Sequence, residues 1–332
     1  MSRQNTVEPP CGYTHIGGQA LIEGVMMRGK NNWALAVRDA RGVLHTEDYP
    51  LPSAEATPAW KKWPLVRGVV SLVSSLAIGM RALTISANLA SIGVDDGEEK
   101  PGEKASAPEE SEGQLSKGAL AGAIVVALAM AVLLFIVAPA AITNLIVGPA
   151  DRQVFLWNLV DGLLRVMAFF GYVLIIGRLP DIHRVFSYHG AEHKTIHCLE
   201  QGEELTPQNA QKYPTLHIRC GTAFLLMVMV IAILIYTLVP IKLIATQAGI
   251  TNSWLLLLVA IAIRLLLLPV IAGISYEITV RWAGRHASNP LVRAVMWPGL
   301  QMQRLTTAEP TDDMLEAAIA ATKAVQAAEA GA

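Results

Sequence analysis

The chain has 332 residues, of which 53% are hydrophobic and 16% are charged, and its mean hydropathy is +0.42. A soluble domain of this length needs more polar surface, so the composition predicts a membrane protein. The net charge of −1 at pH 7 gives no electrostatic support for nucleic-acid binding, and no such partner is expected. Three cysteines are too few for a disulfide framework.

The N-terminal region, residues 12–64, is predicted to form a small β-sheet on the cytoplasmic side. Its start contains no apolar core, so we expect no cleavable signal peptide and a cytoplasmic N-terminus. Short strands are predicted at 19–29, 31–40 and 42–49, separated by turns at 29–32 and 39–42. Glu23, the only acid of the first stretch, is expected to face either the histidine cluster described below or solvent.

The regions on either side of the apolar part of the chain are more polar. Residues 65–94 are predicted to form an amphipathic helix, lying on the membrane surface or packed on other helices, because Arg81 and several serines argue against a span. Residues 95–117 are acidic and predicted to be a disordered linker. Residues 281–332 are predicted to form a helical cytoplasmic tail, whose last helix begins with Thr311 or Asp312 as N-cap.

Residues 118–280 are predicted to form a region of four transmembrane helices. The stretches of spanning length, about 20 residues each, are 120–142, 155–176, 222–239 and 254–274. Basic residues gather in the polar segment 177–220 and in the C-terminal tail, whereas the two short connecting loops hold few. The positive-inside rule therefore places segment 177–220 and both termini in the cytoplasm, beneath a plasma membrane.

Three charged residues lie inside the predicted spans. Asp161 and Arg165 lie in the second span and Arg264 in the fourth. Charges at such depth are costly and need partners. They form either a structural ion pair that fixes helix packing or a polar path through the membrane.

The segment that follows the second span is rich in potential metal ligands. Within "FSYHGAEHKTIHCLE", residues 186–200, His189, His193 and His197 recur every four positions, so a helix places neighbouring histidines on one face. "HGAEH" also matches the H-x-x-E-H pattern of the inverted zinc peptidases, a short pattern of low specificity. We expect His189 and His193 to be metal ligands and Glu192 to be the general base.

Other residues are candidates to complete the ligand set. His217 and Cys220 close the same polar segment, and Glu277 follows the fourth span on the same side. We therefore expect His197, His217 or Glu277 to join the first two histidines. A divalent metal is expected, with zinc as the default for these ligand types. A structural zinc site that uses Cys198, His217 and Cys220 remains open, as does a purely structural role for the polar residues at a membrane boundary.

Six stretches together resemble a known family. They are "IGGQALIEGVMMRG", "RGVVSLVSSLAIGMRAL", "RLPDIHRVFSYHGAEHKTI", "RCGTAF", "SYEI" and "PGLQMQRLTTAEPTDDMLEAAIAA". In this order the chain resembles the YqhQ-like family of uncharacterised bacterial multi-pass membrane proteins, which are predicted to be metal-dependent enzymes. The resemblance implies a membrane location and assigns that chemistry to His189, Glu192, His193 and Lys194. It implies no particular reaction.

These observations predict an α-helical multi-pass membrane protein with a small N-terminal cytoplasmic β-sheet. Its expected function is that of a metal-dependent enzyme, hydrolytic in one interpretation, with a His/Glu site at the cytoplasmic membrane face. The substrate would be a lipid headgroup or a membrane-proximal peptide. The alternatives are a non-enzymatic scaffold or assembly factor that recruits a cytoplasmic protein, and a transporter that uses the charges inside the spans, although the two halves show no repeat.

Overall fold

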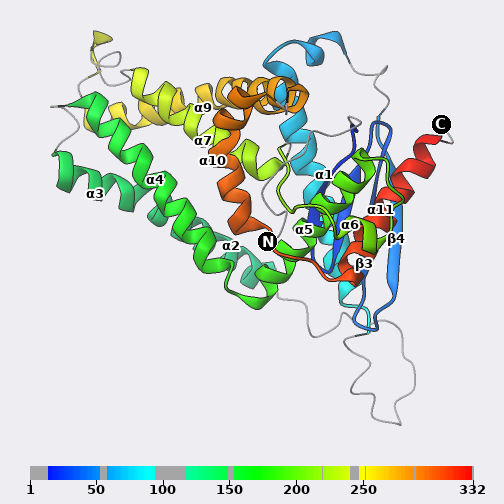
Figure 1. Cartoon of the computed structure of the whole chain (residues 1–332). Coiled ribbons are helices and arrows are strands. Elements are labelled where there is room, and N and C mark those ends of the chain that lie inside the picture. Colours follow the sequence, from blue (N-terminus) through cyan, green and yellow to red (C-terminus); the bar gives the residue numbers. More distant parts are fainter. Residues whose placement is uncertain are drawn as a thin grey trace, which may run out of the picture. The chain divides into compact units, whose positions relative to one another are not determined.

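The computed structural model describes residues 14–52, 58–93, 117–148, 153–218, 220–239, 247–250, 252–286 and 289–330. This part of the chain is mostly helical and contains a small antiparallel sheet (Figure 1). The chain divides into two compact units. One comprises Met1–Val94, Val173–Ala232 and Ile241–Ala332, and the other comprises Asp95–Tyr172 and Ile233–Pro240. The candidate site lies entirely within the first unit, which we call the sheet unit. The predicted linker falls almost wholly outside the described residues.

The sheet contains four strands in the order β1-β2-β3-β4, each antiparallel to its neighbour. The strands are β1 (Gly17–Leu21), β2 (Gly24–Arg28), β3 (Asn32–Arg38) and β4 (Leu44–Pro50). Within the described residues β1 pairs with β2 alone, so β1 is an edge strand. The edge of β1 that pairs with no strand borders the candidate site.

The single strand predicted over 19–29 is wrong, because the structure has a hairpin there. The chain reverses at Ile22 and Glu23, and Glu23 has a φ of 55°. Two-residue hairpin turns use such positive φ values, usually at Gly, Asn or Asp, so the sequence gives no turn signal here. The Glu23 carboxylate accepts a hydrogen bond from Arg184 Nη2 at 2.6 Å. It therefore faces neither the histidines nor open solvent.

Helices cover both faces of the sheet (Figure 1). They are α1 (Val66–Ala90), α5 (Pro180–Glu200) and α11 (Asp312–Ala330). On one face Trp33 packs in a cluster with Ala82 of α1. On the other face Val25 packs with Ala191 of α5 and Leu315 of α11. Burial on both faces explains why β2 and β3 are almost continuously apolar instead of alternating.

The sheet unit also contains helices from the apolar half of the chain. They are α6 (Pro207–Ala210), the first part of α7 (Gly221–Leu238), α9 (Ser253–Tyr276) with its π-helical continuation Glu277–Trp282, and α10 (Pro290–Thr306). Short 3-10 turns occur at Ala59–Lys62 and Ala283–Arg285. Close packing of α10 on α7 needs Gly299, because a Cβ there would lie 2.8 Å from the Cβ of Ala223.

The second unit is helical throughout its described part. It contains α2 (Lys117–Val132), a π-helical stretch (Leu133–Val137), α3 (Ala138–Val147) and α4 (Val154–Ile176), besides the end of α7. In α4 the Arg165 guanidinium Nε lies 2.8 Å from Asp161 Oδ2. Asp161 and Arg165, which the sequence predicts to need partners inside a span, therefore pair with each other across one helical turn.

Four described helical segments are long and apolar enough to cross a membrane: Val66–Ala90, Val125–Val147, Val154–Ile176 and Ile261–Arg285. The last three overlap predicted spans. The predicted span 222–239 coincides with α7, whose apolar stretch Ala223–Leu238 is shorter. The remaining segment is α1, which the sequence predicts to lie on the membrane surface or to pack on other helices; the structure packs one side of it on the sheet.

Candidate metal centre

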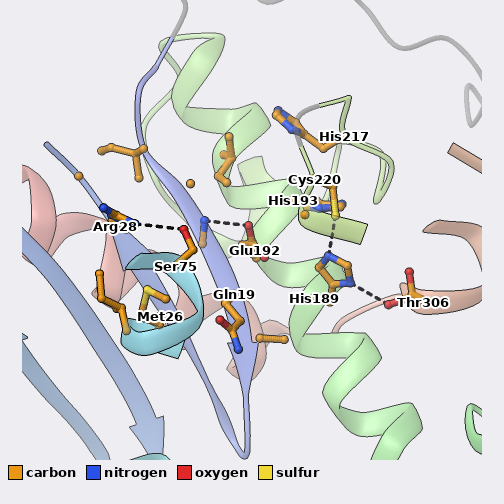
Figure 2. A pocket seen from close by; sticks show the side chains of 18 of the residues that line it. Gln19, Met26, Arg28, Ser75, His189, Glu192, His193, His217, Cys220 and Thr306 are labelled. Carbon is orange, nitrogen blue, oxygen red and sulfur yellow. Dashed lines mark hydrogen bonds between the residues drawn. The ribbon is translucent and has the colours of Figure 1, made fainter. Parts of the chain in front are cut away.

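His189 and His193 of α5 line a cavity of about 610 Å³ in the sheet unit (Figure 2). β1, α1, α5 and the segment that leads into α7 all contribute to its wall. α5 begins at Pro180, a residue suited to a first helical turn, and Asp181 adds a favourable acid there. From Ser187 onward the helix is almost completely buried. Its histidines are therefore interior groups, and each needs a partner or a ligand.

The polar segment after α6 returns to α5 and is fixed there by α10. Gln303 of α10 accepts a hydrogen bond from the backbone N–H of His217 through Oε1 and donates from Nε2 to its carbonyl, both at 2.7 Å. This pair of bonds replaces a strand partner for the segment. It holds Cys220, three residues further on, beside the histidines of α5.

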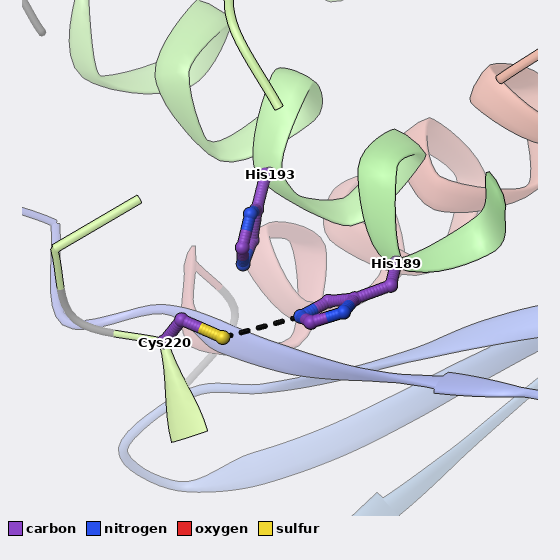
Figure 3. A group of neighbouring side chains, drawn as sticks. All are labelled: His189, His193 and Cys220. Atoms are coloured by element: carbon purple, nitrogen blue, oxygen red, sulfur yellow. Dashed lines mark hydrogen bonds between the residues drawn. The ribbon is translucent and has the colours of Figure 1, made fainter. Parts of the chain in front are cut away.

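His189, His193 and Cys220 converge on one point (Figure 3). One ligand atom from each of the three lies within 4.8 Å of the others. His189 Nε2 is 3.2 Å from the Cys220 sulfur, and the two histidine rings meet edge to face with centroids 4.5 Å apart. Two imidazoles and one thiolate are a ligand set that suits zinc.

Backbone carbonyls orient both imidazoles of this group. His189 Nδ1 donates to the carbonyl of Thr306 at 2.8 Å, and His193 Nδ1 donates to the carbonyl of Thr215. Such bonds leave Nε2 of each ring available, as is usual for metal-ligating histidines. His193 is 1% exposed, and its Nε2 has no hydrogen-bond partner in the described structure. A buried, unpaired nitrogen aimed at a thiol is what an unfilled ligand position looks like.

The electrostatics of the group favour a thiolate. Burial alone would raise the pKa of the Cys220 thiol, but His189 and His193 outweigh it and lower that pKa well below its usual range. For His189, burial opposes the charged form, whereas the Cys220 sulfur and Glu192 raise its pKa to about 9. Both directions favour a thiolate on Cys220 and an imidazolium on His189 in the metal-free protein. A thiolate is also the form that binds metal.

Glu192 lies between the two histidines in sequence and faces β1. Its Oε1 accepts a hydrogen bond from the backbone N–H of Gly18 at 3.0 Å (Figure 2). Burial raises the pKa of this carboxyl, and His193 and His189 partly offset that effect. A Cβ on Gly18 would lie 2.9 Å from the Glu192 Cγ and 2.6 Å from the Met26 carbonyl. The edge of β1 thus holds a carboxylate of raised pKa next to the ligand group.

A second group lies one turn further along α5. His197, Glu200 and His217 are all buried, with ligand atoms within 4.8 Å of one another. Here, however, the polar atoms have partners: His197 Nε2 donates to the Leu216 carbonyl at 2.9 Å, and His217 Nε2 lies 3.5 Å from Glu200 Oε2. Burial and the neighbouring His217 lower the pKa of His197 to about 3. The group therefore consists of a neutral His197 beside a buried His217–Glu200 pair. It packs against the first group, since the His193 and His217 ring centroids lie 5.7 Å apart.

Not every predicted residue joins these groups. Glu277 lies at the end of α9, where its Oε1 accepts a hydrogen bond from Arg67 Nε at 2.7 Å. Cys198 faces the carbonyls of Glu203 and Glu204 instead of Cys220. The structure therefore brings together four of the five predicted ligands but divides them between two groups.

The sequence analysis left out several residues on which the first group depends. Cys220 belongs to the alternative structural zinc site predicted above and not to the favoured set of metal ligands. Thr306 and Gln303 come from α10, more than 80 residues beyond the histidines, and they act through backbone and amide contacts that no motif records. Gly18 is a local feature of the sequence that fits its role, because glycine in a strand permits close approach of another group.

Fold and site define a predominantly helical protein with helices of membrane-spanning length and an α/β/α unit that buries a His/Cys cluster. The family described as "Protein of unknown function (DUF1385)" matches residues 63–328, so the chain belongs to this family. The chain is also 31% identical over 307 residues to the uncharacterized protein YqhQ of Bacillus subtilis (strain 168), covering 91% of this chain and 89% of that protein. The predicted resemblance to the YqhQ-like family is thus confirmed. No solved structure matches the chain.

Proposed function

We propose that the protein is a metal-dependent hydrolase of the bacterial plasma membrane, with a zinc site formed by His189, His193 and Cys220. The observation that carries the proposal is the buried His193 Nε2, which has no hydrogen-bond partner and faces the Cys220 sulfur and a second imidazole. Zinc at this site would supply a Lewis acid that polarises a substrate bond or activates a water. Glu192 would serve as general base.

The main chemical alternative at this site is a nucleophilic cysteine activated by histidine. Cys220 and His189 alone have the contact that such a pair needs. That arrangement leaves no task for His193, whose imidazole is oriented by its own backbone bond and unpaired on the other side. A third ligand position explains His193, so the metal interpretation accounts for more of the site.

Glu192 has the placement and environment that a general base requires. Burial raises the pKa of Glu192 toward neutral pH, and a general base is most effective when its pKa lies near the working pH. The Gly18 N–H fixes one oxygen of the carboxylate and thereby sets the direction of the other. Because Gly221, at the start of the apolar helix α7, lines the cavity, the substrate class that we propose is a lipid headgroup or a membrane-proximal peptide.

A topological argument supports the cytoplasmic location. The sheet, α5 and α11 share one core, so all three must lie on the same side of the membrane. The chain must then cross an even number of times between β4 and α5, although α1, the helix 117–147 and α4 are three candidates. α1 packs along the sheet and is the one excluded. The same rule would make α7 cross together with α9, and the basic residues of 177–220 support a cytoplasmic location for this side and for both termini.

Metal analysis of the full-length protein tests the proposal. Protein purified in detergent without added chelator should contain about one zinc per chain, measured by inductively coupled plasma mass spectrometry. His189→Ala/His193→Ala and Cys220→Ser should each lose it. Glu192→Gln, which removes the base and no ligand, should keep it, and so should His286→Ala, which changes an exposed histidine outside the site.

The opposite outcome is equally clear. If the wild-type protein folds without metal, rebinds none on titration and shows rapid alkylation of Cys220 that depends on His189, the nucleophilic pair replaces the metal proposal. If the double histidine variant also supports function in cells, the cluster is structural. The sheet unit would then act as a scaffold that recruits a cytoplasmic protein.

A further inference from the structure

The cavity extends beyond the proposed metal centre to the other side of the β1 edge. At one end it is lined by His189, Glu192, His193 and Cys220. At the other end it is lined by Gln19 of β1, Arg28 of β2 and Ser75 of α1 (Figure 2), and Ser71 of α1 also lines the cavity. None of this second set is used by the proposed hydrolytic site. The second set is polar and supplies hydrogen-bond donors.

Arg28 is the centre of this second set. Its Nη1 donates to Ser75 Oγ at 3.1 Å and its Nη2 donates to Ser74 Oγ at 3.2 Å. Both acceptors are neutral, and in the described part of the chain no carboxylate forms an ion pair with Arg28. Burial lowers the pKa of this guanidinium, so it is partly desolvated. Among the described residues that line the cavity it is the only lysine or arginine. A desolvated positive charge without a counter-charge is costly unless an anion completes it.

We propose that Arg28, with Ser71, Ser75 and Gln19, binds a phosphate group of the substrate. A guanidinium fork suits the paired oxygens of a phosphate, and hydroxyl and amide donors around it suit the remaining oxygens. This proposal rests on the proposed function and names its substrate class: a phosphate-bearing compound whose other end reaches His189, His193 and Cys220 within the same cavity.

The surroundings of the subsite favour a lipid as the source of the phosphate. The face of α1 opposite Ser71 and Ser75 is apolar and open: Val73, Leu76 and Met80 are 61%, 64% and 57% exposed and lie on the far side of the helix. An exposed apolar stripe of this kind lies stably against acyl chains. α1 would then rest on the membrane surface, and a lipid would reach the cavity around this helix, with its phosphate on Arg28 and its headgroup toward the metal centre.

Direct binding measurements test the subsite without relying on activity. Full-length protein in detergent is first treated with chelator, because phosphate also binds zinc. It is then titrated with inorganic phosphate and, separately, with phosphatidic acid in mixed micelles, and binding is followed by calorimetry and by the thermal unfolding midpoint. The wild-type protein should bind saturably. Arg28→Gln should weaken binding about tenfold or more, Arg28→Lys less, and Ser71→Ala, which disturbs no bond of Arg28, several-fold.

Arg38→Gln is the matched control, because Arg38 is also a strand arginine but pairs with Glu316 away from the cavity. It should bind as the wild-type protein does. Equal binding by wild type, Arg28→Gln and Ser71→Ala, or no saturable binding by the wild type, would overturn the subsite. Tighter binding of phosphatidic acid than of inorganic phosphate supports the lipid source, and equal binding replaces it by a soluble phosphate compound.

The metal proposal and the subsite can fail separately. His189→Ala/His193→Ala keeps Arg28 and should bind phosphate with unchanged affinity. If this variant binds phosphate while the wild-type protein proves to hold no metal, the subsite stands and the hydrolase proposal falls. If the wild-type protein holds zinc but binds neither probe through Arg28, only the subsite falls.

Discussion

At the scale of single residues, the candidate site is determined by where backbone groups point. The Thr306 and Thr215 carbonyls orient two imidazoles, the Gly18 N–H holds Glu192, and Gln303 clamps the backbone of His217. Each contact positions a reactive group through a part of the chain that carries no side-chain signature. The geometry of the site therefore depends more on how closely backbone segments approach the reactive side chains than on which side chains surround them.

Gly18→Ala tests that dependence. A Cβ there would meet the Met26 carbonyl at 2.6 Å and the Glu192 Cγ at 2.9 Å, and the first of these is backbone that cannot move aside cheaply. We expect a loss of about 1–3 kcal/mol in the free energy of unfolding, measured by denaturation in mild detergent, and displacement of Glu192. Zinc content should stay near the wild-type level, because no ligand changes.

Gly17→Ala is the neighbouring control. A Cβ at Gly17 would meet no atom within 4 Å, so its effect should stay within about 0.5 kcal/mol. If both variants unfold alike, or if Gly18→Ala is as stable as the wild-type protein, then α5 does not pack on β1 as closely as described here.

At the scale of elements, the Asp39 carboxylate holds the β3–β4 turn together through hydrogen bonds. Asp39 Oδ1 accepts hydrogen bonds from the N–H groups of Arg41 and Val43 at 3.0 and 2.8 Å. Its Oδ2 lies 2.9 Å from His45 Nε2. The bond with His45 and those with the backbone lower the pKa of Asp39 below its ordinary value of 3.8, against the opposing effect of burial.

The depressed pKa predicts how the hairpin responds to acid. Ionised Asp39 stabilises the folded state above the unfolded pKa, and this contribution is lost as the pH falls through the lower folded pKa. Asp39→Asn should therefore lower the unfolding midpoint at pH 7, and its difference from the wild-type protein should shrink below about pH 4. Asp48→Asn, an exposed carboxylate change on β4, should show a smaller effect. A difference that grows in acid would contradict the assignment.

At the scale of the whole molecule, the shared core of the sheet unit constrains the membrane topology. The described residues include five helical segments of spanning or near-spanning length, counting α7. Residues 17–50, α5 and α11 come from the two ends and the middle of the sequence, yet they pack in one core. Since a bilayer cannot divide a core, membrane crossings between these segments would come in pairs, and we propose that α1 remains on the cytoplasmic side.

Cysteine labelling tests the position of α1. In a Cys11→Ser background, Lys62→Cys and Ser91→Cys place exposed thiols before and after α1. Both should react with a membrane-impermeant maleimide only after the cytoplasmic side of the membrane is made accessible. If the two sites react from opposite sides, α1 crosses the membrane and another helix does not. The native Cys198 and Cys220 are buried and give little background.

Much of the fold could be predicted from the sequence because it rests on local regularities. Apolar runs fix the long helices, β-branched and aromatic stretches predict strands over 31–40 and 42–49, and the spacing of His189, His193 and His197 predicts one helical face. The hairpin at Ile22 and Glu23 could not be predicted, since the positive φ of Glu23 is imposed by pairing of β1 with β2 and by Arg184.

The sequence by itself determined the class of protein, its family and the helix that carries the histidines, because hydropathy and residue spacing act over short stretches of chain. Only the tertiary structure decided which groups meet. It brings His189 and His193 together with Cys220 and places His197 and His217 in a separate buried group with Glu200. Glu277 instead forms an ion pair with Arg67. It also placed Arg28 in the same cavity. These contacts join residues that are distant in sequence, and burial in a common core, which no local pattern encodes, brings them together.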